Sequence, residues 1–478
     1  MRKTMKNKEK ALINVSKKTF IQVTLLLLIL MTGAIVLTYV VPRGQFGVFE
    51  DGTVNYLDYK MLDGGSGINI IKGIFAPFLV FASGDGLTLI MLCLFLLVIS
   101  ASFQVMNDAG GINALIGYVS EKFKERKYLL VITVSFVFMC FGAFLGLFEE
   151  MLTMLPIVTA LCVLVGFDSF TGFLISIIAC GFGFASAITN PFTVILASEI
   201  IKTNPMENIW YRFVIFAVMF LLLLGFVFLY IRKIKKDPTA SLTYAHDLKI
   251  KENVSSAATS SPVDTKKTRI VYTVFLLLSL VIIIVASSLP FLRGYTVVIL
   301  LAYFLIFGIA AGLICTGNVK GVFKSFLKGL TGALPTLVFI ALASSVKFIF
   351  EEGGIMPTVV HAINEFSFGK NIFVVALVIY AVVLVLEFFI SSSTAKAILV
   401  MGIFSVASVG LTKQMSVLLY TFADGYTNVL FPTSPVLLIS LSMIELDYFK
   451  WVKKSLPLFL INLALVVGFI ILGIVIGY

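Results

Sequence analysis

Long apolar runs alternate with short polar loops along most of this 478-residue chain. The runs cover residues 20–41, 84–107, 209–232, 270–289, 294–314, 330–350 and 455–477. An apolar run of about 20 residues is long enough for an α-helix to cross a bilayer. The pattern therefore predicts an all-α polytopic membrane protein.

Two further segments, 172–200 and 415–444, are apolar at both ends but interrupted by polar and proline-containing stretches. The first interruption reads Thr189-Asn190-Pro191-Phe192-Thr193, and the second runs from Thr427 to Pro435. A helix that breaks in lipid leaves backbone groups unpaired, so such breaks occur beside a cavity or inside protein. A pair of breaks in corresponding halves points to a transporter's binding site. The residues expected to break the helices are Gly183, Pro191, Gly425, Pro432 and Pro435.

Composition agrees with this class, because 59% of the residues are hydrophobic and only 13% are charged. The net charge of +11 comes from basic residues that lie between the apolar runs, so it indicates topology and not nucleic-acid binding. Residues 1–19 are predicted to form a cytoplasmic tail. Residues 233–268 form a predicted cytoplasmic linker, whose Ser-, Thr- and Ala-rich part from 237 to 265 is expected to be flexible and without a core of its own.

Charge also decides how two remaining apolar segments are placed. If residues 128–165 formed one crossing, the basic end of 209–232 would lie outside, against the positive-inside rule. A re-entrant hairpin over 128–165 returns that end to the cytoplasm, and a second hairpin is predicted over 371–410. Trp210 and Trp451 are expected at matching interfacial positions.

The two halves of the chain repeat. Gly86-Leu87-Thr88 recurs as Gly329-Leu330-Thr331 and Gly110-Gly111 as Gly353-Gly354, at one spacing of 243 residues. The first repeat is predicted over 20–232 and the second over 269–478. An odd number of crossings separates matching elements, so the repeats should be inverted. The predicted fold has about nine transmembrane helices, two of them discontinuous, and two re-entrant hairpins, with the N-terminus cytoplasmic and the C-terminus outside.

The breaks predict a site for a small solute near the middle of the membrane. Asn190 and Ser434 each precede a proline, so new half-helices should begin at Pro191 and Pro435. The N-terminus of a helix favours an anion such as a carboxylate. The hydroxyl and amide groups expected to bind substrate are those of Thr189, Asn190, Thr193, Ser391, Ser392, Ser393, Thr394, Thr427, Asn428, Thr433 and Ser434. The alternative for each hydroxyl is a bond to its own helix.

Acidic residues are the second component of the predicted site. Glu149 and Glu150 lie at the first hairpin tip and Asp424 precedes the second break. A charge at membrane depth is costly and is by default a functional hypothesis. Adjacent glutamates cannot both point the same way, so one should face the substrate and the other should contact protein. The alternative is internal pairing with lysines of the second half. Asp168 is expected to be a helix cap.

Several ordered motifs resemble the YfcC/DcuC-type carriers, over most of residues 20–475 without the linker. These motifs are Phe148-Glu149-Glu150, Leu155-Pro156, Gly166-Phe167-Asp168, Gly183-Phe184-Ala185-Ser186, Asn190-Pro191-Phe192-Thr193, Asp424-Gly425-Tyr426-Thr427-Asn428 and Phe431-Pro432-Thr433-Ser434. The resemblance implies inverted repeats, two hairpins, two unwound helices and a homodimer with a sliding, elevator-like transport domain. Relatives that carry dicarboxylates have a Ser-Asn-Thr triplet at each hairpin tip. Here one tip has Glu149-Glu150, and the other has Ser391–Thr394 without the asparagine.

This departure favours a substrate that carries a cationic group, and the resemblance implies exchange of arginine for ornithine across the cell membrane. The alternatives are a sodium- or proton-coupled symporter of carboxylates or peptides and, more remotely, an ion channel. An intramembrane hydrolase or an ATP-driven pump is not expected, because the chain has no HExxH, GxSxG or P-loop motif. No metal or cofactor is predicted beyond coupling to Na⁺ or H⁺. The expected partners are a small solute and the lipid bilayer.

Overall fold

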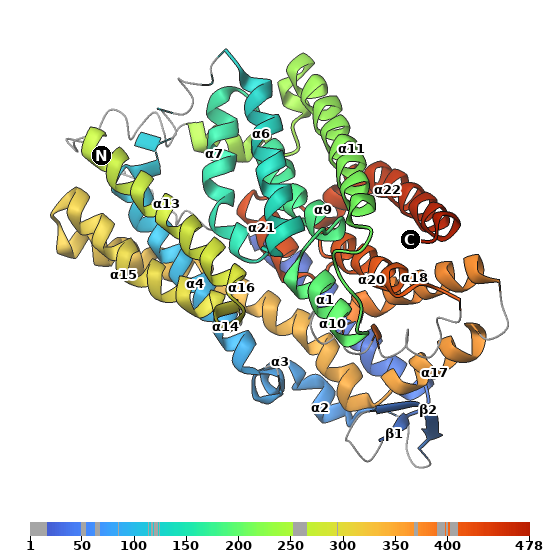
Figure 1. Ribbon diagram of the computed structural model, residues 1–478. Coiled ribbons are helices and arrows are strands. Elements are labelled where there is room, and N and C mark those ends of the chain that lie inside the picture. Colours follow the sequence, from blue (N-terminus) through green and yellow to red (C-terminus); the bar gives the residue numbers. More distant parts are fainter. Residues whose placement is uncertain are drawn as a thin grey trace.

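A computed structural model describes most of the chain. The described residues are 17–48, 54–62, 67–84, 86–251 apart from 113, 116–117, 119–122 and 124, 265–367 apart from 294, 371–389, 397, 400–401 and 410–478. Within them the chain is almost entirely helical, and two groups of helices pack separately (Figure 1).

The first group, here called the α4 bundle, surrounds helix α4. Its members are α1 (Lys17–Val40), α4 (Gly86–Asp108), α13 (Thr265–Ser288), α15 (Thr296–Thr316) and α16 (Val319–Gly353). Serine hydroxyls of α4 bond carbonyls of its two neighbours: Ser100 Oγ donates to Gly329 O at 2.8 Å and Ser102 Oγ to Phe304 O at 2.7 Å. Hydroxyl bonds between helices are typical of membrane bundles, because lipid offers these groups no alternative partner.

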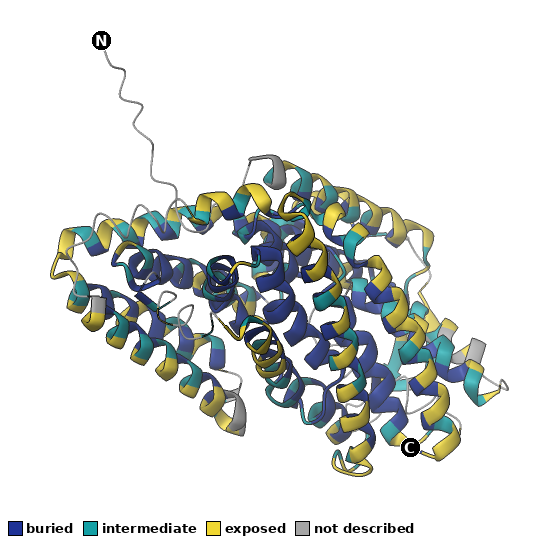
Figure 2. Ribbon diagram, turned by 90° about the horizontal axis from the view of Figure 1, so that it is seen from above, coloured by how far each residue is buried: buried dark blue, intermediate teal, exposed yellow. Residues whose placement is uncertain are grey.

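The second group, here called the hairpin unit, contains the segment of the first predicted hairpin, the first arm of the second and both broken helices. Its elements are α6 (Lys127–Cys140), η2 (Phe141–Leu145), η3 (Glu150–Thr153), α7 (Leu155–Val165), α8 (Ser169–Phe173), η4 (Leu174–Ile178), α9 (Ala179–Ala185), η5 (Pro191–Ile195), α10 (Leu196–Ile200), α11 (Ile209–Lys236), α18 (Ile372–Phe389), α20 (Lys413–Thr427), α21 (Pro435–Met443) and α22 (Tyr448–Ile476). Buried residues concentrate in the interior of the molecule, and the outer helices expose apolar side chains (Figure 2). On α11, for example, Leu221 and Leu229 are 66% and 70% exposed, as expected of a helix that faces lipid.

Eight helices among the described residues are long and apolar enough to cross a membrane. Seven coincide with the predicted uninterrupted spans. The eighth, Lys127–Leu145, is the first arm of the predicted hairpin 128–165, whose tip follows at Gly146. Each of the two broken segments consists of shorter helices, and none of these helices is long enough to cross a membrane by itself. The predicted helical, multi-pass membrane fold is confirmed.

The order of elements also agrees with the predicted repeat. In each half an arm of a hairpin is followed by a discontinuous helix and then by one long helix: α6, α8 to α10 and α11 in the first half, and α18, α20 to α21 and α22 in the second. The tip and the return arm of the second hairpin lie almost wholly outside the described residues.

The loop after α1 has structure that the sequence did not predict. Strand β1 (Gly44–Val48) pairs antiparallel with β2 (Val54–Met61), and the short helices α2 (Ile70–Ile74), α3 (Ala76–Leu79) and η1 (Val80–Ala82) lead into α4. The sheet packs against α17 (Met356–Ser367), where Tyr59 stacks on His361 with ring centroids 4.0 Å apart. The short helix α14 (Pro290–Arg293) connects α13 to α15.

The prediction that the linker is flexible is wrong for its first part. Residues 238–240 form the short helix η6 (Pro238–Ala240) and residues 244–251 are helical. Ser241 and Asp247 bond residues at the start of α8. Asp168 explains why, because it caps α8 as predicted, accepting from Thr171 N at 2.8 Å, and also accepts from Ser241 Oγ at 2.7 Å. Asp247 Oδ1 accepts from Ser169 N at 3.1 Å. Residues 252–264 lie outside the described part.

The same linker segment reaches the loop after α21. Lys249 Nζ lies 2.6 Å from Glu445 Oε2 and His246 Nδ1 lies 3.8 Å from Glu445 Oε1. His246, followed by Lys249, lowers the pKa of the Glu445 carboxyl to about 2. The linker therefore contacts loops of both halves through polar side chains. Composition alone does not predict these contacts.

Candidate functional site

The first break occupies residues 186–190, between α9 and η5, and lies against the tip of the first hairpin. Ile188 N and Thr189 N both donate to Ala143 O, at 2.9 and 3.2 Å, and Thr189 Oγ1 donates to Phe144 O at 3.2 Å. The hairpin's π-helical turn, η2, thus supplies carbonyls for backbone groups that the break leaves unpaired. The break lies inside protein, as a broken membrane helix requires.

Asn190 caps the half-helix that follows this break. Its Oδ1 accepts from Phe192 N at 2.9 Å, while its Nδ2 donates to Gly142 O at 3.3 Å. The half-helix begins at Pro191, as predicted. The amide of Asn190 is therefore engaged by protein at both ends, whereas the hydroxyl of Thr193 is buried and finds no hydrogen-bond partner within the described residues.

The second break occupies residues 428–434, between α20 and α21. Ser434 caps α21, accepting from Leu437 N at 3.4 Å, and the helix begins at Pro435 as predicted, with Pro432 inside the break. Asn428 Nδ2 donates to Asp424 O at 2.9 Å and Thr427 Oγ1 donates to Ala423 O at 3.1 Å. Both side chains therefore bond carbonyls of the preceding helix, α20. For the Thr427 hydroxyl, this is the alternative to substrate binding that the sequence analysis gave.

Two of the expected helix-breaking glycines lie inside helices instead. Gly183 belongs to α9 and Gly425 to α20. A Cβ at Gly183 would come 1.9 Å from Met139 O, and one at Gly425 would come 2.0 Å from Ala185 Cα. The prediction that these glycines break helices is wrong. Because they have no side chain, α9 can pack closely against α6, and α20 against α9, beside the breaks.

Side chains from the long helix after each break satisfy backbone carbonyls of that break. Arg212 of α11 is 3% exposed and its Nη1 donates to Ala187 O at 3.0 Å. In the second half, Trp451 Nε1 of α22 donates to Val429 O at 3.1 Å. Trp451 is fully buried inside the protein, whereas Trp210 is 55% exposed. Their matching interfacial positions stay a prediction.

Sequence reasoning missed both contacts. Arg212 is a cation inside a predicted span, which indicates a functional or structural role. Because it lies near the start of that span, it was not distinguished from an ordinary interfacial cation. Trp451 gave no such signal, because an interfacial tryptophan and a buried one have the same place in the sequence.

The acidic residues converge where the first hairpin tip meets the second broken helix. Glu149 is exposed at the tip, whereas Glu150 is 5% exposed and its Oε2 accepts from Phe148 N at 3.3 Å. The two side chains therefore differ in environment, and the prediction that one of them faces the substrate stays a prediction. The carboxylates of Glu149 and Asp424 lie within electrostatic range of each other, and Tyr420 lies within range of both Asp424 and Glu387. Asp424 is fully buried.

The structure thus brings together the two breaks, the first hairpin tip and the carboxylates of Glu149, Glu150 and Asp424. Thr433 and Ser434 are both 6% exposed at the start of α21. The second hairpin tip, with Ser391, Ser392, Ser393 and Thr394, lies outside the described residues. Within the described chain, no three His, Cys, Asp or Glu side chains are arranged to hold a metal ion.

Comparison with known proteins agrees with the carrier architecture. A provisionally named basic amino acid antiporter, YfcC of Escherichia coli, is 24% identical over 406 residues, which cover 81% of this chain and 78% of that protein. An uncharacterized protein of Haemophilus influenzae is 26% identical over 383 residues, or 79% of this chain and 74% of that one. The crystal structure of the YdaH transporter of Alcanivorax borkumensis aligns over 95% of this chain and 98% of that chain, with 17% identity and a TM-score of 0.45. The model of the C4-dicarboxylate anaerobic carrier family, DcuC, matches residues 20–475. The chain belongs to the DcuC carrier family.

Proposed function

We propose that this carrier exchanges basic amino acids, with the cationic side chain of the substrate bound at the acidic first hairpin tip. The observation that carries the proposal is the exposed Glu149 within electrostatic range of the buried Asp424. Two carboxylates that face one polar region favour a cation between them, because unlike charges attract more strongly where water is scarce. The name of the Escherichia coli relative points to the same class of substrate.

The other end of a basic amino acid is a carboxylate, and the two half-helices offer positions for it. Helix α21 and the segment from Pro191 to Ile200 both begin at the breaks, with their caps holding one N–H each. The remaining N–H groups and the positive ends of the helix dipoles favour an anion. The unpartnered hydroxyl of Thr193 lies in the first turn of one of them and can donate a further bond.

Proton-coupled symport is the second candidate, and the series of carboxylates supports it. Glu150, Glu149 and Asp424 lie in electrostatic range of one another in that order. Acidic residues in such a series inside a membrane can accept and release protons. In that case the same residues would carry a proton in place of the substrate's cation.

We also propose elevator-like movement of the hairpin unit along the α4 bundle. A small cavity between them, on the α4 and α16 side, is lined almost entirely by apolar side chains: Leu96, Ile99, Leu152, Ala333, Thr336, Ile439 and Met443. An apolar seam has few directional bonds to break when one side slides. A disulfide that joins Ile99→Cys to Ile439→Cys should stop transport, and its reduction should restore it. The homodimer that the family resemblance implies stays a prediction.

Counterflow in liposomes tests the substrate. Purified protein is reconstituted into liposomes loaded with ornithine, arginine or succinate, and labelled arginine or succinate is added outside, with and without ion gradients. Ornithine-driven arginine uptake without a gradient is the expected result. Uptake of succinate driven only by sodium would overturn the proposal, and arginine uptake that requires a proton gradient would favour the symporter.

Variants of the acidic tip provide the second test. Glu149→Gln is expected to lower arginine counterflow at least tenfold, since the cation loses a charged partner. Glu365→Gln, which changes an exposed carboxylate on α17, serves as the matched control and should leave transport unchanged. Wild-type kinetics in Glu149→Gln and in Glu150→Gln would refute the acidic-tip assignment.

A further inference from the structure

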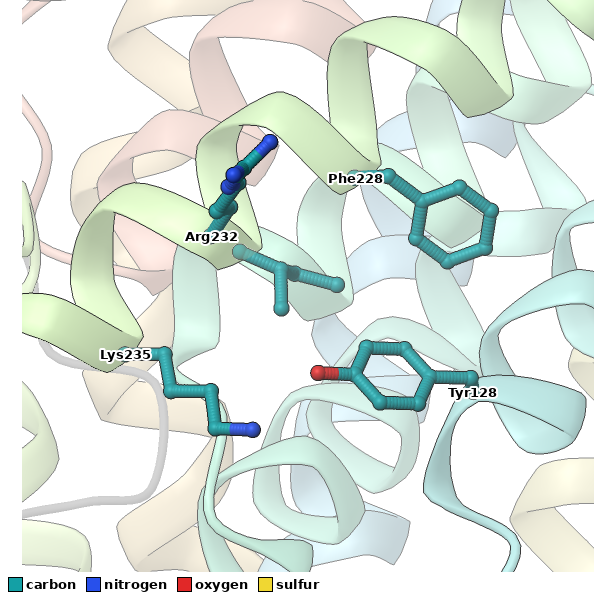
Figure 3. Close-up of a pocket in the computed structure, with 5 residues that line it drawn as sticks. Tyr128, Phe228, Arg232 and Lys235 are labelled. Atoms are coloured by element: carbon teal, nitrogen blue, oxygen red, sulfur yellow. The ribbon is translucent and has the colours of Figure 1, made fainter.

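A cavity outside the carrier site opens between the first turn of α6 and the last turns of α11. It has a volume of about 480 Å³ and is lined by Tyr128, Phe228, Ile231, Arg232 and Lys235 (Figure 3). Tyr128 begins the arm of the first hairpin that ends at the acidic tip. The cavity therefore lies at the other end of α6 from Glu149, where the helices leave the membrane.

The α11 wall of this cavity changes from apolar to cationic along one helix face. Phe228, Ile231, Arg232 and Lys235 are spaced by three or four residues, so their side chains line one stripe of the helix. The two apolar residues lie toward the centre of the span and the two cations lie at its end. This gradient matches an amphiphile that has its apolar part in the membrane and its anionic part at the surface.

The α6 wall adds an aromatic ring and a hydroxyl. The Tyr128 ring meets Phe228 edge to face, with centroids 6.0 Å apart, and the phenol is 46% exposed. Figure 3 shows the Tyr128 hydroxyl and the Lys235 ammonium directed toward each other across the cavity. A tyrosine whose ring packs against apolar groups and whose hydroxyl contacts water is typical of the membrane interface.

Basic residues at the end of α11 have a simpler explanation, since they complement the helix dipole and mark the cytoplasmic side. That explanation applies to all four of Arg232, Lys233, Lys235 and Lys236. Only Arg232 and Lys235 line the cavity. No carboxylate in the described part of the chain forms an ion pair with either of them.

We propose that this cavity binds the headgroup of an anionic phospholipid. Its phosphate lies between the Lys235 ammonium and the Tyr128 hydroxyl, which donates to a phosphate or glycerol oxygen, and Arg232 adds a second positive charge to the cavity wall. One acyl chain follows Phe228 and Ile231 toward the membrane centre. Basic pockets between helices at the cytoplasmic surface are suited to such headgroups, because the cations and the anion meet where solvent screening is weaker than in bulk water.

Native mass spectrometry of the full-length protein in detergent tests the site. Delipidated protein is titrated with phosphatidylglycerol and, separately, with phosphatidylcholine of the same acyl chains. We expect about tenfold tighter binding of phosphatidylglycerol to the wild type. The double variant Arg232→Gln/Lys235→Gln should lose that preference, since each interfacial charge changes affinity roughly fivefold.

The matched control is Lys233→Gln/Lys236→Gln, which removes the same charge from the same helix end but does not touch the cavity. It should keep the preference for phosphatidylglycerol, and equal losses in both double variants would overturn the proposal. Inorganic phosphate and glycerol phosphate at millimolar concentration distinguish the source of the anion. Failure of both to displace the lipid supports a lipid site, whereas displacement by either at the affinity of the lipid would reassign the cavity to a free anion.

Discussion

Trp451→Phe should destabilise the protein through the second break, although the substitution is conservative by sequence. The indole N–H is the donor to Val429 O, which lies in a fully buried residue of the break. Leaving a buried carbonyl without its partner costs about 1–3 kcal/mol. The smaller phenyl ring also leaves a void of roughly 40 Å³, worth about 1 kcal/mol at 24 cal/mol per Å³. The expected loss is therefore about 2–4 kcal/mol.

Trp210→Phe is the matched control, because the chain has only two tryptophans and Trp210 is 55% exposed at the start of α11. Unfolding in mixed micelles, followed by circular dichroism, should show a loss below about 0.5 kcal/mol for this variant. Each variant keeps one tryptophan, so acrylamide quenching provides a readout that does not depend on unfolding. Trp451 should be protected and Trp210 quenched. Equal stability of the two variants, or equal quenching of the two indoles, would refute the reasoning.

Three other predictions test features around the breaks. Gly425→Ala should cost more than about 2 kcal/mol by forcing α20 from α9, whereas Gly225→Ala, where a Cβ meets nothing within 4 Å, should be neutral or stabilising in the same unfolding assay. Arg212→Met should cost about 1–3 kcal/mol in that assay, because a buried carbonyl of the first break loses its donor. The lowered pKa of Glu445, about 2, contributes stability that is present above pH ~4.3 and is lost as the pH falls toward 2. After allowance for screening this is about 1 kcal/mol. The hydrogen-exchange protection factors of residues 241–251, each corrected for the intrinsic exchange rate at its pH, should therefore be lower at pH 3 than at pH 7.

The sequence predicted the features that local chemistry determines. Helices begin at Pro191 and Pro435 because a capping residue precedes a proline that needs no N–H donor. The re-entrant hairpin over 128–165, which follows from keeping positive charge on one side of the membrane, stays a prediction. These rules act within a few residues or through the bilayer, so one sequence is enough to apply them.

The features that it did not predict depend on contacts between distant segments. Trp451 is buried because the break 22 residues before it needs a donor, and Asp247 has a role because α8, 78 residues away, begins beside it. Gly425 is required by the backbone of Ala185 in the other half of the chain. Spacing and composition do not reveal such pairs, so the contact of Trp451 was missed and a segment that packs against α8 was predicted to be flexible.

In each half a backbone carbonyl of the break accepts a hydrogen bond from a side chain of the following long helix, but the donors differ. This difference is relevant to the substrate. Each break has a carbonyl that needs a donor from the following long helix, and the first half supplies the cation of Arg212 where the second supplies the neutral indole of Trp451. The first hairpin tip carries Glu149 and Glu150, whereas the buried Asp424 lies inside the second broken segment, so the acidic groups also occupy different positions in the two halves. A symmetric pair of breaks would offer equivalent ends to a symmetric dianion. The exchange proposed above concerns a solute with a carboxylate at one end and a cation at the other, and such a solute needs a site with unlike ends.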